Sequence, residues 1–315
     1  MHGLRQVAVL SVCLMLLVVT IVSFAGRAGG QTSRPTAKVA GLPDETIREP
    51  RRQVQDSQLF QPRRGAQRRS RNQAPDRSEY DNWELKPDFK DDVFTFVRIE
   101  YDSYGGRRGG GWRNDYPDCD WNFSLRLRQL TSMEVHPNGR VLRLTDLDLF
   151  DYPFVFMTNV QGMSLSDSEC AGLRSYLLNG GFLMADDFWA ADAWRHVKAE
   201  MQRVLPGREP RELTIDHPIF RTVYQLNTLP QVPSIFAWQR GDLVERWHGS
   251  FEGDESPHFQ AWFDDNGRMV ALFCHNNDIA DGWEREGENR EYFERYSEKM
   301  SYPFGINLIT WVMTH

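Results

Sequence analysis

Apolar positions in the second part of the chain follow two different periods. Residues 92–102 (DVFTFVRIEYD) alternate and are rich in β-branched and aromatic side chains, which predicts a strand. Residues 140–149 form a second strand region, and residues 153–160 (PFVFMTNV) are a continuous apolar run typical of a buried parallel strand. Residues 119–133 place Phe123 and other apolar side chains at helical spacing. Strands and helices therefore alternate from the start of this region.

The next helix has clear boundary signals in the sequence. Ser166 and Glu169 have the spacing of a capping box, and Gly180 is suited to the C-terminal cap. Residues 182–186 (FLMAD) predict the strand that follows, and residues 189–205 predict another helix, stopped by the Pro-Gly pair after it. Short links between such elements favour a parallel sheet with helices on both faces.

The last part of the chain departs from this alternation. Residues 258–276 contain two apolar runs around Asp265-Asn266-Gly267, which is a favoured turn sequence and predicts a β-hairpin. Residues 302–315 predict a closing helix that packs on the sheet. We therefore expect an α/β domain over residues 91–315, with a doubly wound, mostly parallel sheet and an added β-hairpin.

Charge divides the chain into two parts. Residues 26–78 contain 12 Lys and Arg against 5 Asp and Glu, whereas residues 79–315 contain 24 against 39, a net charge of −15. Such an acidic globular part repels phosphates, which argues against a nucleic-acid partner. Residues 26–90 have few apolar side chains and are predicted to be a disordered basic linker. The linker is either a solvated tether or a contact with a membrane surface or an anionic envelope polymer.

The N-terminus has the pattern of an export signal. Arg5 precedes an apolar run from Val7 to Ala25, and Ser23 and Ala25 are small residues suited to cleavage before Gly26. The run of about 19 residues is also close to the length that spans a bilayer, so a retained anchor is the alternative to a cleaved signal peptide. Both interpretations predict an extracytoplasmic, periplasmic location for the rest of the chain.

Three stretches resemble one known family. Residues 152–189 are similar to the central block of the bacterial domain-of-unknown-function family 4159, residues 215–226 to its next block, and residues 304–315 to its closing helix. The family is assigned to the class I glutamine amidotransferase-like superfamily, so the resemblance implies a flavodoxin-like sheet. It implies no reaction.

One departure from that superfamily bears on activity. Its amidotransferases carry a cysteine nucleophile in a Gly-x-Cys-x-Gly turn after a central strand, whereas the comparable turn here reads MADDFW, residues 184–189. Cys170 and Cys274 lie elsewhere and read as small buried apolar residues. We therefore expect no amidotransferase activity.

The adjacent acids of that turn are the first candidates for a functional site. Asp186 and Asp187 follow a buried strand, and ligands of open α/β sheets bind outside the carboxyl ends of the strands. One aspartate is explained by helix capping, and Asp187 is the expected cap, with Asp186 facing the ligand crevice. His217 is the candidate general base, although a histidine bonded to a local carbonyl is the alternative.

Further polar residues are expected to converge on the same edge. The candidate ligand-binding residues end three other strands and are Arg98, Glu100, Asn159, Asn276, Asn277 and Asp278. The sequence contains neither an HExxH motif nor a Cys/His pair with zinc-ligand spacing, so it predicts no metal and no cofactor of that kind. A hard-cation site built on Asp186, Asp187 and Asp278 stays open, because carboxylates suit Ca²⁺ or Mg²⁺.

Two functions are compatible with these features. The first is an exported, non-catalytic domain that binds a small-molecule or protein ligand near the membrane, favoured by the missing nucleophile and the basic tether. The second is a hydrolase that uses the strand-end aspartates with His217, with or without a hard divalent cation.

Overall fold

The computed structural model describes residues 80–86, 92–104 and 111–315. The export segment, the linker up to residue 79 and residues 105–110 of the glycine-rich loop lie outside the described residues. The chain divides into two units, Met1–Gln53 and Val54–His315, and every described residue belongs to the second unit.

Within the described residues, the strands form one seven-stranded sheet. They are β1 (Val97–Ile99), β2 (Arg140–Leu142), β3 (Phe154–Thr158), β4 (Phe182–Phe188), β5 (Arg211–Glu212), β6 (His258–Phe263) and β7 (Met269–His275). The α-helices are α1 (Asp118–Leu130), α2 (Asp167–Leu178), α3 (Ala190–Val204), α4 (Ile235–Gln239), α5 (Asp281–Glu284), α6 (Arg290–Tyr292) and α7 (Tyr302–Thr314). Shorter helical turns are η2 (Gly111–Arg113), η3 (Leu147–Asp151), η4 (Val160–Gly162), η5 (Pro218–Arg221) and η6 (Arg246–His248), and η7 (Phe293–Ser301) is a π-helix.

The sheet is mostly parallel, as predicted. Its strand order is β2-β1-β3-β4-β7-β6-β5, and neighbouring strands from β2 to β7 are parallel. β6 pairs antiparallel with β7 through the predicted hairpin, and β5 pairs antiparallel with β6 at the edge. The carboxyl ends of β1, β3, β4 and β7 therefore meet at one edge of the sheet.

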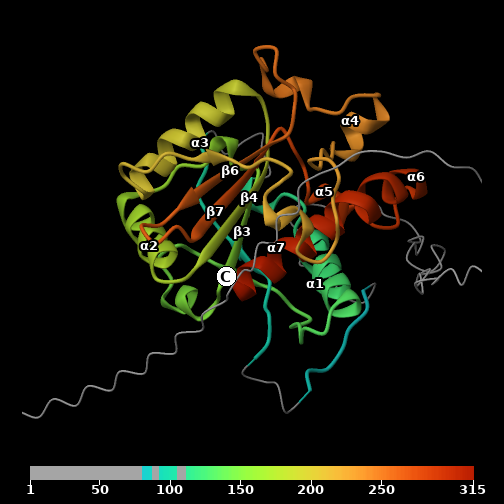
Figure 1. Cartoon of the computed structure of the whole chain (residues 1–315), viewed down its shortest axis with the longest axis horizontal. Coiled ribbons are helices and arrows are strands. Elements are labelled where there is room, and N and C mark those ends of the chain that lie inside the picture. Colours follow the sequence, from blue (N-terminus) through green and yellow to red (C-terminus); the bar gives the residue numbers. More distant parts are fainter. Residues whose placement is uncertain (1–79, 87–91, 105–110) are drawn as a thin grey trace, which may run out of the picture. The chain divides into compact units, whose positions relative to one another are not determined.

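Helices cover both faces of the sheet, because the central strands are apolar on both sides. Phe154 and Phe156 of β3 pack into one core cluster with side chains of α1 and α7. Val155 and Met157 alternate with them and pack into the other cluster with α2 and α3. Figure 1 shows α2 and α3 on one side of the sheet and α1 and α7 on the other.

Local signals in the sequence produced the expected local structure. Ser166 and Glu169 form a complete capping box at the start of α2, and Gly180 takes a positive φ of 113° just after its end. Gly267 takes a φ of 80° in the hairpin turn between β6 and β7. The described cysteines, Cys119, Cys170 and Cys274, are unpaired and buried.

The prediction that Asp187 caps the following helix is wrong. β4 continues through Phe188, so α3 begins only at Ala190, and its N-cap residue is Trp189, which makes no side-chain capping bond with a described residue. The strand is longer than its apolar run because Phe188 pairs with His275 of β7, and the register shifts between Ala185 and Phe188. Both aspartates lie in this irregular stretch, which re-aims side chains as β-bulges do.

Among the described residues, no helix combines the length and apolar character needed to cross a bilayer.

Candidate functional site

A buried group of carboxylates lies at the carboxyl edge of the sheet. Asp187 comes from β4, Asp278 follows β7, and Asp115 comes from the loop between β1 and α1. One oxygen from each of these three lies within 4.8 Å of the others, and we call them the three-aspartate cluster. Each is at most 7% exposed. Three carboxylates this close repel one another strongly in a site from which water is excluded.

Asp187 is held from three directions. Its Oδ2 accepts hydrogen bonds from the Asn114 side chain at 2.8 Å and the Asn159 side chain at 3.2 Å, and its Oδ1 accepts one from the Trp189 indole at 2.9 Å. These donors are neutral, so they fix the orientation of the carboxylate without cancelling its charge. Asn159, predicted as a ligand-binding residue, is thus part of the site.

The other two carboxylates of the cluster keep oxygen atoms for a ligand. Asp278 Oδ1 accepts the backbone N–H of Asp281 at 2.9 Å, and Asp115 Oδ2 accepts the Thr158 hydroxyl at 3.3 Å. Within the described part of the chain, none of the three aspartates forms an ion pair. When ionised, the cluster therefore carries negative charge that no ion pair balances, and Arg98 and Arg285 act on Asp115 without pairing with it.

Asp186 adds an incompletely bonded carboxylate beside the cluster. Its Oδ2 accepts the backbone N–H of Ala280 at 2.8 Å, while its fully buried Oδ1 has no hydrogen-bond partner among the described residues. A buried carboxylate oxygen without a partner costs free energy, and such atoms in a folded protein call for a water or an ion.

A second carboxylate group shares Asp115 but is largely occupied. Asp281 and Glu284 of α5 lie within 4.8 Å of Asp115 and of each other. Asp281 accepts hydrogen bonds from the Ile235 backbone and the Tyr292 hydroxyl, and both acids form ion pairs with Arg285. These bonds tie α5 to α4 and α6. The three-aspartate cluster is consequently the group with oxygens left to bind a ligand.

Backbone strain concentrates around this site. Six described non-glycine residues have a positive φ, and four of them are Asp115 (61°), Asn159 (56°), Asp187 (52°) and Asn276 (54°). Asn and Asp tolerate this conformation better than other residues, yet each instance still costs free energy. These four residues group where β1, β3, β4 and β7 end. We infer that the backbone there accepts strain in order to place these side chains, because the strained conformations do not stabilise the fold.

The electrostatics of the cluster favour protonation when no cation is present. Burial raises the pKa of Asp187 to about 7, and the charge of Glu245 adds to the rise. Burial, together with the charge of Asp187, also raises the pKa values of Asp115 and Asp278 well above the ordinary range. A group of acids whose pKa values are all raised has a high affinity for positive charge, either protons or a metal ion.

The other predicted ligand-binding residues have different places. Arg98 is fully buried and binds Asp120 through two nitrogens, and its guanidinium also donates to the carbonyls of Trp112 and Asn114. It therefore supports the loop that carries Asn114 and Asp115. Glu100 pairs with Arg143 at 3.0 Å, on the side of the sheet that α2 covers.

Asn276 and Asn277 bond to backbone groups beside the site. The Asn276 side chain accepts the N–H of Ala190 and donates to two carbonyls of residues 254 and 256. The Asn277 side chain accepts the N–H of Val232 and donates to the Pro230 carbonyl. Both hold the loops around the β7 end, whereas Asp278 next to them belongs to the three-aspartate cluster.

His217 is not brought to the acids. It follows β5, which lies three strands from β4, and its Nδ1 accepts the backbone N–H of Ile219. Its ring packs 5.3 Å from that of Trp311 in α7. These contacts give His217 a local structural role, but its ring accepts a backbone N–H and not, as the alternative expected, a bond with a local carbonyl.

Asn114, Asp115 and Asp281 were not singled out from the sequence. Asn114 and Asp115 follow a glycine-rich loop and precede α1, so no strand end marks them. Asp281 lies only three residues after Asp278, and the acidic spacing DIADGWE was the available signal. The rule that sites form outside strand ends pointed to this edge of the sheet but not to the loop that completes the cluster.

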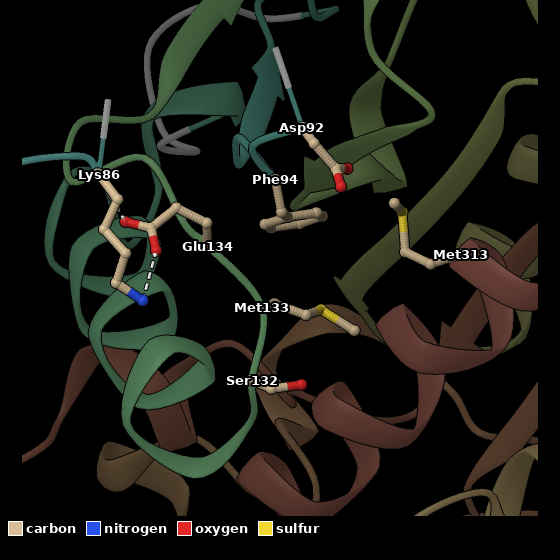
Figure 2. Close-up of a pocket in the computed structure, with 7 residues that line it drawn as sticks. All are labelled: Lys86, Asp92, Phe94, Ser132, Met133, Glu134 and Met313. Carbon is tan, nitrogen blue, oxygen red and sulfur yellow. Dashed lines mark hydrogen bonds and ion pairs between the residues drawn. The ribbon is translucent and has the colours of Figure 1, made fainter. Parts of the chain in front are cut away.

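A shallow cavity of about 190 Å³ lies at the opposite edge of the sheet. It is lined by Lys86, Asp92, Phe94, Ser132, Met133, Glu134 and Met313. Figure 2 shows the Lys86–Glu134 ion pair of 3.4 Å at one side and the apolar side chains of Phe94, Met133 and Met313 around the space. Lys86 is paired with Glu134, and the cavity adjoins the segment that precedes β1, away from the strand carboxyl ends. It is a weaker candidate than the acidic site.

Comparison with known families agrees with the resemblance seen in the sequence. The model of the family described as "Domain of unknown function (DUF4159)" matches residues 95–313. The chain belongs to this family. No curated protein matches the chain. The matched range runs from before β1 to residue 313 in α7 and contains every carboxylate of the acidic site, so the site is part of the DUF4159 domain itself.

Proposed function

We propose that this DUF4159 domain binds a hard divalent cation in the three-aspartate cluster and uses it to hold an anionic ligand at the carboxyl edge of the sheet. The observation that carries the proposal is the close approach, within 4.8 Å, of three buried carboxylate oxygens that have no cationic side-chain partner among the described residues. Asp115, Asp187 and Asp278 supply oxygen ligands only, which suits Mg²⁺, Ca²⁺ or Mn²⁺ better than zinc.

The bound cation would also resolve the electrostatic cost of the site. The two positive charges of the cation offset most of the charge of three carboxylates. The cation also occupies the lone pairs of Asp187 that the bonds from Asn114, Asn159 and Trp189 leave free. Because the domain is acidic overall, an anionic ligand would be repelled without the cation. With the cation bound, this part of the negative surface attracts an anionic ligand.

The strand order supports a more specific fold assignment. The parallel strands follow the order β2-β1-β3-β4-β7, which is the 2-1-3-4-5 order of flavodoxin-like sheets with β7 as the fifth strand. We infer from this order a flavodoxin-like, doubly wound topology and membership of the class I glutamine amidotransferase-like superfamily. An aspartate, Asp187, lies in the last residues of β4, and the described cysteines are buried on α1, α2 and β7, which supports a function other than amidotransfer.

Location outside the cytoplasm is part of the same proposal. The Val7–Ala25 sequence supports export, and the basic linker supports a position near an anionic surface. A reporter fused after Ser78 is expected to be active only when the reporter works outside the cytoplasm. N-terminal sequencing of the mature chain separates a cleaved signal from a retained anchor, and reporter activity in the cytoplasm would refute export.

The cation proposal is tested with Mn²⁺, whose free ion gives an electron paramagnetic resonance signal that disappears on binding. Titration of the purified full chain should show one tight site per chain in the wild type. The variant Asp278→Asn should lose this site because it removes a carboxylate of the cluster. Asp264→Asn is the matched control, since Asp264 is a little-exposed carboxylate in the β6–β7 hairpin turn outside the cluster. Equal Mn²⁺ binding by all three proteins would refute the proposal.

A further inference from the structure

A histidine–carboxylate pair lies on the segment that packs beside the turn after β4. Val244 shares one apolar cluster with Trp189 and Ala190, which begin α3, and the N–H of Ala191 donates to the Ser250 carbonyl at 3.0 Å. η6, which contains His248, lies between these two attachment points. The same Trp189 donates its indole N–H to Asp187, so the segment is anchored next to the three-aspartate cluster.

The pair itself is fixed more firmly than an ordinary surface ion pair. The Nε2 of His248 lies 2.6 Å from Oε2 of Glu245, and the hydroxyl of Ser234 donates to the other oxygen of Glu245. Glu245 is 8% exposed, and the side chain of His248 is 22% exposed. Because the bond to the carboxylate fixes a proton on Nε2, the other ring nitrogen, Nδ1, is left as a proton acceptor.

Trp189 links the pair to the cluster. Its ring packs with Val244, next to Glu245 in the chain, and its indole N–H donates to Asp187. A proton acceptor oriented by a carboxylate, next to a cation site, is the arrangement found where a bound water is activated. His217, which the sequence suggested for this role, lies across the sheet.

We propose that His248, positioned by Glu245, is the proton-transfer residue of a hydrolytic site for phosphoesters, whose phosphoryl oxygens are held by the cation of the three-aspartate cluster. This inference rests on the proposed cation site. Phosphoryl oxygens are the substrate groups that complete the ligand sphere of a carboxylate-bound Mg²⁺. Arg285, whose charge acts on Asp115, is already paired with Asp281, Glu284 and Glu288.

The step balances without any further reactant. Nδ1 of His248 takes a proton from the attacking water while the water oxygen forms a bond to phosphorus. The bond from phosphorus to the ester oxygen breaks, and its electron pair stays on the departing oxygen. That oxygen takes the proton from His248, which returns the imidazole to its neutral form, and the products are a phosphate and an alcohol.

The experiment measures p-nitrophenolate release from p-nitrophenyl phosphate and bis(p-nitrophenyl) phosphate by the full chain, with and without Mg²⁺ or Mn²⁺. The wild type should release the product only with the cation. His248→Ala should lower the rate at least about 100-fold, as expected for loss of a general base, and added imidazole should restore part of it. His258→Ala is the matched control, because His258 also pairs with carboxylates, Glu212 and Asp254, but lies on β6.

A positioning role for Glu245 has its own readout. Glu245→Gln should lower kcat with KM nearly unchanged, and it should have no additional effect on kcat in the His248→Ala background, because the two residues act as a unit. A purely structural role would instead add its loss to that of His248→Ala.

The outcomes separate the two proposals. If Mn²⁺ binds the cluster but the loaded chain releases no product from either ester, or if His248→Ala keeps wild-type activity, the hydrolytic assignment is overturned and the cation site stands. If Mn²⁺ does not bind, both proposals fail.

Discussion

The substitution Asp278→Asn separates a cation site from an ordinary buried acid. Asp278 keeps one structural bond, Oδ1 to the Asp281 N–H, which an asparagine carbonyl can also accept. The rest of the side chain faces other acids, and the charge of Asp187 is the largest one acting on it. The substitution therefore removes repulsion while retaining the bond that holds the loop, and it should stabilise the cation-free protein.

The size of this gain in stability is bounded by the cost of ionising Asp187. The rise in the pKa of Asp187 from 3.8 to about 7 corresponds to about 4 kcal/mol for ionising it in the cation-free protein. Burial is the main cause of that rise and the charge of Glu245 comes next, so removing the Asp278 carboxylate recovers only a minor part of it, about 1 kcal/mol above neutral pH. A domain of this size shifts by about 2–4 °C per kcal/mol, so Tm should rise by about 2–4 °C.

Calorimetric melts with and without a cation complete this test. At a Mg²⁺ or Mn²⁺ concentration 100 times Kd, the wild type should gain about 2.7 kcal/mol, or about 5–11 °C in Tm, while Asp278→Asn should gain nothing. A variant that is less stable than the wild type without a cation, yet responds equally to the cation, would refute the reasoning.

Three other predictions follow from contacts of the fold. The pKa of Asp187 is about 7 in the folded chain and 3.8 ordinarily, so its contribution to cation-free stability is full below about pH 4 and is lost as the pH rises to 7. Chemical denaturation should therefore show lower stability at pH 8 than at pH 5. A saturating cation should reverse this trend. Ser166→Ala breaks the capping box of α2 and should lower stability by about 1 kcal/mol in urea unfolding, whereas Ser166→Thr should not. Arg98→Leu leaves Asp120 buried without its partner and should cost about 3–5 kcal/mol, while the double variant with Asp120→Leu should recover much of that loss in the same assay.

The sequence was informative where local rules decide the structure. The capping box at Ser166 and the turn at Gly267 depend on residues a few positions apart, so both were predictable. Apolar runs likewise located the parallel strands, and the strand-end rule pointed to Asp187, Asn159 and Asp278.

The sequence was misleading where distant pairing decides the structure. Phe188 continues β4 because it pairs with His275, almost ninety residues later, and this moved the start of α3 and removed the capping role of Asp187. Asp115 joins the site because buried Arg98 holds the carbonyls of the adjacent loop, a contact that no sequence period signals. His248 was missed for the same reason, because the segment that carries it is held beside α3 by the packing of Val244 on Trp189 and the bond from Ala191 to Ser250.

The central claim is that the three-aspartate cluster holds a divalent cation, and anomalous diffraction from crystals grown with Mn²⁺ tests it most directly. The account predicts one strong anomalous peak at bonding distance, about 2.0–2.6 Å, from oxygens of Asp115, Asp187 and Asp278. Ordered crystals at saturating Mn²⁺ with no anomalous peak among these three carboxylates would contradict it.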